Sequence, residues 1–164
     1  MAREAERTVR QTVLDRLLDD NPSTGSDPAE SWSESVSRMK ESLLRDLEWL
    51  LNTRRSIVRA PENCPEVNLS VHTYGLPDVS SLSGDSDATR EVLLRELEET
   101  IELFEPRLMQ VRISATEGED SAQRRIRFVI EGLMRMDPNP ERVLFDTVLE
   151  LSSGKIFVGG DANA

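Results

Sequence analysis

The stretch that decides the fold is RDLEWLLNTRR, which spans Arg45–Arg55. It closes an apolar stripe at helical spacing that runs from Val36 to Asn52, and each leucine buried there contributes roughly 1.5–3 kcal/mol. Ser31 and Glu34 fit a capping box, which places the start of this helix near Trp32. The chain is therefore predicted to be organised around one long helix whose apolar face is formed by Val36, Met39, Leu43, Leu44, Leu47, Leu50 and Leu51.

One large aromatic residue of this helix, Trp49, lies outside the apolar stripe, on the side of Arg45. A tryptophan on the polar face of a core helix needs a second cover. We favour the N-terminal segment as that cover, and a pocket on a partner protein is the alternative. A short amphipathic helix is predicted in that segment over residues 4–19, with an apolar face made of Val9, Val13, Leu14, Leu17 and Leu18.

Composition excludes several classes of protein. The 164 residues carry a net charge of −11 and a pI near 4.6, which disfavours binding to nucleic acid or to anionic membrane surfaces. The single cysteine, Cys64, excludes an internal disulfide and a zinc site built from cysteines. The N-terminus does not resemble a signal peptide, and no stretch reaches the ~18 apolar residues of a membrane span. A soluble, cytoplasmic protein is expected.

The middle of the chain alternates between irregular segments and one more helix. Residues 21–30 are predicted to be a linker, and residues 59–84 to be irregular apart from an ordered turn at 74–78. A helix is predicted over residues 87–105 and is stopped by Pro106. Its N-cap is predicted among Asp85, Ser86 and Asp87. A short edge strand is predicted within the irregular segment from the alternation of Val67, Leu69 and Val71.

After Pro106 the apolar period changes from helical to the two-residue period of strands. Turns are predicted at residues 117–120, 137–140 and 152–155, and short turns favour antiparallel pairing. The fold class is therefore α+β, with N-terminal helices packed on a small antiparallel β-sheet that ends in a C-terminal hairpin. The inward-facing strand residues are predicted to be Met109, Val111, Ile113 and Ala115, then Ile126, Phe128 and Ile130, then Val143, Phe145, Thr147, Leu149 and Leu151, and finally Ile156 and Val158.

Signatures of catalysis, metal binding and cofactor binding are not found in the sequence. The single histidine, His72, has no spaced ligand partner, and neither a nucleophile motif nor a glycine-rich phosphate loop is present. Asp46, Glu48 and Glu105 are the carboxylates with fixed surroundings that could form a glycosidase pair. In so acidic a chain, solvated surface carboxylates are the simpler interpretation, and no cofactor is expected.

The segment Glu105-Pro106-Arg107 stands out at the predicted corner between helix and strand. Glu105 and Arg107 place opposite charges on either side of a helix-stopping proline. If this pair is exposed, it contributes ~0–1 kcal/mol. If it is buried against a partner, losing one member costs about 3–5 kcal/mol. The sequence leaves both alternatives open.

Three motifs, RDLEWLLNTRR, YGLPD and EPRL in that order, resemble the TssE family of baseplate subunits of bacterial type VI secretion systems. That family is grouped with the baseplate wedge protein of contractile-tailed phages and is often labelled lysozyme-like. The resemblance covers about Leu14 to Val158, and the LLNTRR ending followed by EPRL is its most specific part. It implies a small α+β domain, in agreement with the residue pattern. The implied division is residues 1–35 as an N-terminal helix and linker, 36–158 as the baseplate wedge domain, and 159–164 as a frayed tail.

The resemblance implies a structural role at the baseplate, on the cytoplasmic side of the inner membrane. TssF and TssG are the implied wedge partners, and the motif Glu105, Pro106 and Arg107 is implied to hold that contact. The sheath proteins TssB and TssC are implied to join by strand addition at the C-terminal hairpin. The hairpin residues given this role are Val143, Phe145, Leu149, Ile156 and Val158.

Two other functions remain as alternatives. A peptidoglycan hydrolase would use Glu105 or Glu48 as its general acid, and would need a substrate cleft and a carboxyl group with a raised pKa. An acidic adaptor would bind one partner through the Trp49 face or the N-terminal helix.

Overall fold

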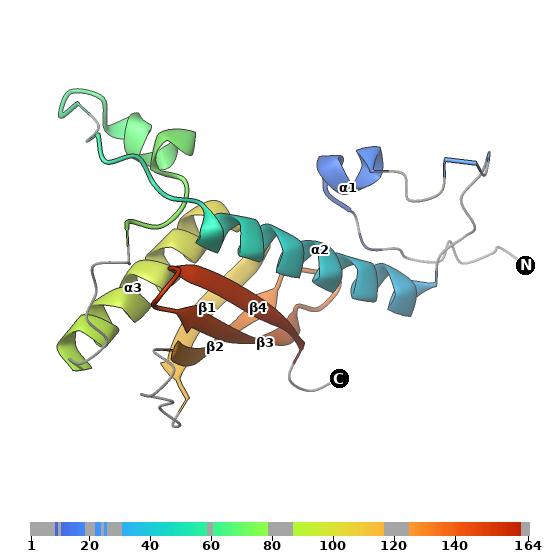
Figure 1. Ribbon diagram of the computed structural model, residues 1–164. Coiled ribbons are helices and arrows are strands. Elements are labelled where there is room, and N and C mark those ends of the chain that lie inside the picture. The colour runs from blue at the N-terminus through green and yellow to red at the C-terminus, as the bar shows by residue number, and fades with distance from the viewer. Residues whose placement is uncertain are drawn as a thin grey trace, which may run out of the picture. The chain divides into compact units, whose positions relative to one another are not determined.

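The computed structural model describes residues 9, 11–18, 22–23, 25, 31–58, 61–78, 87–116 and 125–161. These residues belong to two compact units, which divide after Leu43. Helices come first and strands after, so the fold is α+β, as predicted (Figure 1). In chain order the elements are α1 (Val13–Leu17), α2 (Trp32–Asn52), the 3₁₀ helices η1 (Pro65–Leu69) and η2 (Val71–Thr73), α3 (Asp87–Phe104), β1 (Leu108–Ala115), β2 (Arg125–Met134), β3 (Glu141–Glu150) and β4 (Lys155–Asp161).

The first unit contains α1, which is shorter than the predicted helix over residues 4–19. Thr12 is its N-cap, and the Thr12 hydroxyl accepts a hydrogen bond from the backbone N–H of Asp15 at 3.2 Å. Residues 9, 11 and 12 are therefore not helical, and residues 1–8 lie outside the described part of the chain. The Asp15 carboxylate accepts a hydrogen bond from the Ser42 hydroxyl at 2.7 Å, which ties α1 to α2.

The long helix α2 begins at Trp32, as the capping box predicts. The Ser31 N–H donates to the Glu34 carboxylate at 2.8 Å, and the Glu34 N–H donates back to the Ser31 hydroxyl at 3.4 Å. Leu44, predicted in the apolar stripe, remains partly exposed. The other six stripe residues are buried: Val36, Met39, Leu43, Leu47, Leu50 and Leu51.

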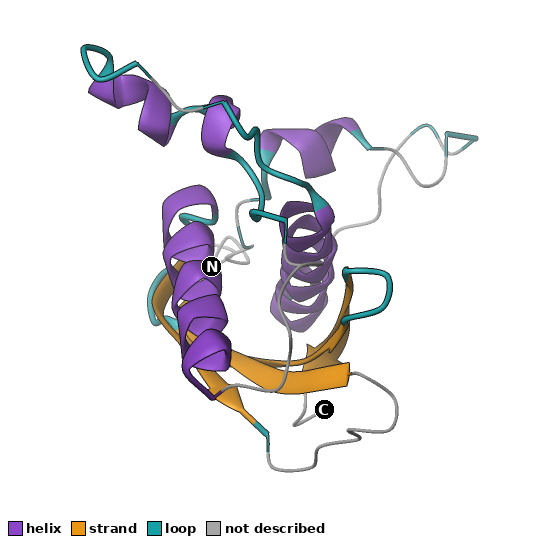
Figure 2. Cartoon of the chain, turned by 60° about the vertical axis from the view of Figure 1, so that its left-hand side comes forward, coloured by secondary structure: helices purple, strands orange, loops and turns teal. Residues whose placement is uncertain are grey.

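The second unit is built on a four-stranded antiparallel sheet with strand order β1-β2-β3-β4. α3 and residues 44–52 of α2 lie on the same face of this sheet (Figure 2). The inward residues of β2 and β3 match the predicted alternation, because these strands have helices on one face only. The core of this unit includes Leu47, Leu50, Leu51, Leu93, Leu97, Ile101, Ile126, Phe128, Ile130, Val143, Phe145, Thr147 and Leu149.

The alternation predicted for β1 is wrong at the start of the strand, where Leu108 rather than Met109 is buried. Val111 is buried as predicted, while Ile113 and Ala115 pair with the inward residues Ile130 and Phe128 but stay partly exposed and exposed. The cause of the error at Met109 is a β-bulge between Met109 and Arg112, where Gln110 adopts a φ of 54°. An extra residue in one strand shifts the phase of the side chains that follow, and sequence periodicity does not reveal it.

The predicted edge strand at Val67, Leu69 and Val71 is also wrong, because these residues belong to η1 and η2. Pro65 starts η1, and the Ser70 hydroxyl caps η2 by accepting the His72 N–H at 3.2 Å. Local turn chemistry therefore prevails over a weak alternation of apolar residues.

The ordered turn predicted at residues 74–78 is confirmed, and it joins the end of α2. The Leu76 N–H donates to the Thr53 carbonyl at 2.9 Å, and the Arg55 N–H donates to the Leu76 carbonyl at 2.8 Å. Gly75 has a φ of 97°, and a Cβ there would lie 2.3 Å from the Thr53 carbonyl oxygen, so only glycine fits. The LLNTRR and YGLPD motifs thus form one local structure.

The C-terminal hairpin forms as predicted, with a turn at residues 151–154, but β4 is longer than expected. Residues 159–161 belong to the strand rather than to a frayed tail, because a bulge after Val158 lets Asp161 pair with Phe145. Residues 162–164, most of the predicted linker 21–30, the predicted turn 117–120 and the cap candidates Asp85 and Ser86 lie outside the described residues.

Candidate functional site

The corner between α3 and β1 is built by the motif Glu105-Pro106-Arg107. The Glu105 N–H makes the last helical hydrogen bond, to the Ile101 carbonyl at 2.8 Å. The Leu108 N–H then donates to the Glu105 carbonyl at 3.0 Å, which closes a four-residue turn with Pro106 in its second position. Proline suits that position because its fixed φ matches the turn and its missing N–H is not needed there.

Arg107 is held by two carboxylates of its own chain. Its Nε and NH2 groups donate to the two Glu105 oxygens at 2.7 and 2.5 Å, a bidentate arrangement. NH2 also donates to the Asp46 carboxylate on α2 at 2.6 Å. The motif therefore links α2, the end of α3 and the start of β1.

This ion-pair cluster is buried within the second unit. Glu105 is 5% exposed, and the Arg107 side chain is 14% exposed. Burial by itself lowers the pKa of Arg107, but the hydrogen bonds and charges of Glu105 and Asp46 outweigh burial and raise the pKa above its usual value. The exposed-pair alternative is thus wrong. The pair is buried against the chain's own α2, and no partner is needed to cover it.

A second cation continues the cluster towards the surface. Arg45 donates from Nε and NH2 to the other Asp46 oxygen at 3.0 and 2.8 Å. The Arg45 guanidinium also lies over the Trp49 ring, 5.1 Å from its centroid. Trp49 is 53% exposed, and the prediction that the N-terminal segment covers it stays a prediction.

Tyr74 borders the same cluster from the YGLPD turn. Its ring makes an edge-to-face contact with Phe104, with the two ring centroids 5.2 Å apart. Burial raises the pKa of the Tyr74 hydroxyl, and the nearby charges of Asp46 and Glu105 raise it further. The three motifs that were separate in the sequence therefore meet at one corner of the fold.

The five hairpin side chains assigned to the sheath contact all point into the core: Val143, Phe145, Leu149, Ile156 and Val158 are each at most 8% exposed. β3 lies inside the sheet, paired on both sides, while β4 is an edge strand. Of these five residues, only Ile156 and Val158 on β4 could therefore pair with a partner strand, and they would do so through their backbone. Whether they do so stays a prediction.

The two edges of the sheet are each bound by a side chain from a helix, which sequence reasoning missed. On β4, the Ile156 N–H donates to the Asn52 side-chain oxygen at 2.9 Å, and the Asn52 amide donates to the Ile156 carbonyl at 2.7 Å. On β1, the Ile113 N–H donates to the Glu98 carboxylate at 2.7 Å. The only signal in the sequence was the asparagine within LLNTRR, Asn52, at which the long helix ends.

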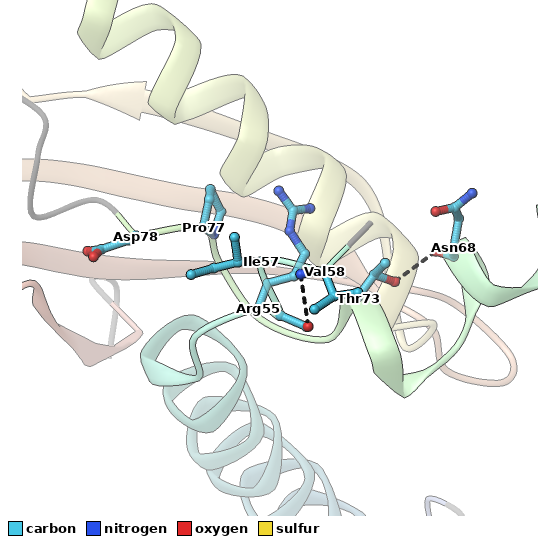
Figure 3. A pocket seen from close by; sticks show the side chains of 8 residues that line it. Arg55, Ile57, Val58, Asn68, Thr73, Pro77 and Asp78 are labelled. Carbon is cyan, nitrogen blue, oxygen red and sulfur yellow. Dashed lines mark hydrogen bonds between the residues drawn. The ribbon is translucent and has the colours of Figure 1, made fainter. Parts of the chain in front are cut away.

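A separate hollow of about 500 Å³ lies between the segment after α2 and the segment that contains η1 and η2 (Figure 3). Its wall includes Arg55, which donates to Glu96 on α3 at 2.6 Å, and Ile57, which is 96% exposed. The only dashed contacts between the lining residues are local, Val58 N–H to Ser56 and Thr73 hydroxyl to the Asn68 carbonyl. Among the described residues that line this hollow, Asp78 is the only carboxylate, so the pair that a hydrolase needs is not found there.

The carboxylates considered for hydrolysis lie elsewhere. Both Glu105 oxygens are occupied by Arg107, and Glu48 is on α2 next to the exposed Trp49. Among the described residues, no group of three or more histidine, cysteine, aspartate or glutamate side chains could hold a metal ion. In that same part of the chain, none of the helices is long and apolar enough to cross a membrane.

Fold and corner together define a small α+β domain whose helices pack on one face of an antiparallel sheet with an exposed edge strand. Residues 37–139, more than half of the chain, match the family model of the baseplate wedge protein gp25. The chain belongs to this family, which includes TssE, so the resemblance in the sequence is confirmed. The family consists in general of structural components of phage and contractile-injection baseplates. No curated protein and no solved structure matches the chain.

Proposed function

We propose that the chain is the TssE-type subunit of a type VI secretion baseplate and acts as a structural joint between the wedge and the sheath. The observation that carries this proposal is the family match over residues 37–139, which contains the RDLEWLLNTRR, YGLPD and EPRL motifs. The subunit works in the cytoplasm, recruited to the baseplate at the inner membrane.

The wedge contact, with TssF and TssG, involves the corner around Glu105, Pro106 and Arg107. Because Arg107 is mostly buried and already paired, it acts by holding α2 and β1 in place. The accessible groups beside it are Pro106, which is exposed, and Trp49 with its stacked Arg45. Tryptophan and arginine are enriched among residues that dominate binding energy, which supports Trp49 as the anchor of this contact.

The sheath contact, with TssB and TssC, involves the backbone edge of β4. An edge strand offers unpaired N–H and C=O groups to which an extended segment of another chain can add. β4 pairs only with β3 among the described strands, and this supports its use as the template for the first sheath subunit.

The test is fluorescence imaging of a tagged sheath subunit in the source cells. Wild type is compared with a deletion, and with the deletion complemented by Trp49→Ala or by the control Arg142→Ala. Arg142 forms an ion pair with Glu131 in which the side chains are 61% and 41% exposed, so its loss should be silent. Deletion and Trp49→Ala should abolish dynamic sheaths, and Arg142→Ala should restore them. Normal sheaths in the deletion strain would overturn the proposal.

A structural joint needs no catalytic activity. Purified cell wall incubated with the purified chain should therefore release no fragments. Turnover that disappears in Glu105→Gln would instead support the hydrolase alternative.

A further inference from the structure

The backbone of β4 is already occupied at one point of its outer edge. Both Ile156 groups, N–H and C=O, are bound by the Asn52 side chain. A primary amide carries one acceptor and one donor side, so it reproduces the two bonds that a neighbouring strand would make to one residue. The same amide also donates to the Glu48 carbonyl at 2.8 Å, which anchors it to the last turn of α2.

Among the described residues, no side chain binds the next outward-facing position on β4 in this way. Backbone groups of an antiparallel strand point to opposite edges at alternate residues, and the pairing of β4 with β3 is continuous from Ile156 to Val158. Because the backbone N–H and C=O groups of Ile156 point away from β3, those of Val158 do so too. Beyond Val158 come Gly159 and Gly160, and a Cβ on Gly160 would meet nothing within 4 Å.

We propose that Asn52 is an edge-capping residue that closes the hairpin end of β4 and confines a docking strand to Val158–Asp161. The occupant is an extended segment of the sheath subunit, so the second half of this inference rests on the proposed sheath contact. Asn52 acts as a positioning residue, because it sets where on β4 pairing can begin. The cap itself is a property of the free chain and is tested without any partner.

The first experiment measures hydrogen exchange of individual backbone amides by NMR in the full chain. The Ile156 amide should exchange more slowly than the Val158 amide in the wild type. Asn52→Ala should accelerate exchange at Ile156 roughly tenfold, the change expected when one ordinary hydrogen bond is lost. Exchange of the Phe157 amide, whose N–H points towards β3, should be unaffected.

The other sheet edge supplies a matched control. Glu98→Ala should accelerate exchange at Ile113 and leave Ile156 unchanged, whereas Asn52→Ala should do the reverse. Exchange at Ile156 that is as fast in the wild type as in Asn52→Ala would overturn the cap.

The second experiment adds purified sheath subunits to the wild-type chain. Protection should appear at Val158 in the wild type, and the partner should add protection at Ile156 only in Asn52→Ala, where the edge is open. Val158→Pro removes the outward N–H without removing a bond to β3, and should weaken binding at least about tenfold while the fold is retained. If Val158→Pro does not fold, protection of Val158 in the wild type decides the question alone.

An increase in Ile156 protection when sheath subunits bind the wild type would mean that the partner displaces the cap, and would overturn the confinement. Association of Asn52→Ala chains with one another in sedimentation, absent in the wild type, would support the cap by showing that it shields the edge. Failure of the wild type to bind sheath subunits would overturn the sheath contact in the proposed function, while the exchange data on the free chain would still decide the cap.

Discussion

The β1 and β4 edges of the sheet are protected by the same device in two chemical forms. At β1, the Glu98 carboxylate accepts from Ile113, and a carboxylate can accept only. At β4, the Asn52 amide both accepts from and donates to Ile156. Each edge strand also contains a bulge, near Gln110 in β1 and after Val158 in β4.

The two edges differ in what lies next to the cap. β1 leaves the buried corner of Glu105 and Arg107 and is packed against α3, so its start is fixed by charge. β4 continues past its cap into two glycines with no further helix side chain bound to its edge among the described residues. The start of β1 is thus tied to the charged corner and to α3, whereas the C-terminal part of β4 has no such tie among the described residues.

The largest effect is expected from removing Arg107 from the buried ion-pair cluster at the start of β1. Arg107→Ala leaves the carboxylates of Glu105 and Asp46 without their shared partner, and Glu105 is 5% exposed. The free energy of unfolding in urea should fall by about 3–5 kcal/mol. Arg142→Ala, which removes an exposed ion pair, should cost ~0–1 kcal/mol under the same conditions. Equal effects of the two substitutions would show that burial of the corner is unimportant.

A pair of glycine substitutions tests the bulge in β4. A Cβ on Gly159 would lie 3.0 Å from the Asp146 carbonyl oxygen, a backbone atom that cannot easily move. Gly159→Ala should therefore cost about 1–3 kcal/mol in the same unfolding measurement. Gly160→Ala enters open space and should stay within about 0.5 kcal/mol of the wild type. A neutral Gly159→Ala would contradict the tight approach of β4 to β3.

The two caps are compared by removing each one and then both. Asn52→Ala and Glu98→Ala should each lower the free energy of unfolding by about 1–2 kcal/mol. Because three strand spacings of about 4.8 Å separate the two edges, the double variant should be additive within about 0.5 kcal/mol. Asn52→Asp, which keeps the acceptor but loses the donor to Ile156, should be less stable than the wild type. A large non-additive term would mean that the edges are coupled through the sheet.

The smallest effect concerns the hairpin that leads into β4. Hydrogen bonds from Ser153 and Arg125 lower the pKa of Glu150 below its ordinary value of 4.5. A lowered pKa in the folded state stabilises the fold above the unfolded-state pKa, and this stability is lost as the pH falls through the folded-state pKa. An NMR titration should place the Glu150 pKa below that of a free glutamate, and Ser153→Ala should raise it. A pKa that Ser153→Ala leaves unchanged would assign the shift to Arg125 instead.

The sequence by itself determined the elements whose signal is local. The Ser31–Glu34 capping box set the start of α2, Pro106 set the end of α3, and strict alternation gave the inward faces of β2 and β3. Three motifs sufficed to recognise the family, because their residues satisfy local requirements such as the positive φ of Gly75.

Only the tertiary structure decided which groups far apart in the chain meet. Asp46 joins Arg107 across 61 positions, and Asn52 reaches Ile156 across 104. The bulge at Gln110 and the 3₁₀ turns after Pro65 were likewise invisible to periodicity. The physical reason is that a buried charge or an exposed strand edge must find a partner wherever the packing of helices on the sheet brings one. Sequence spacing carries no record of that packing.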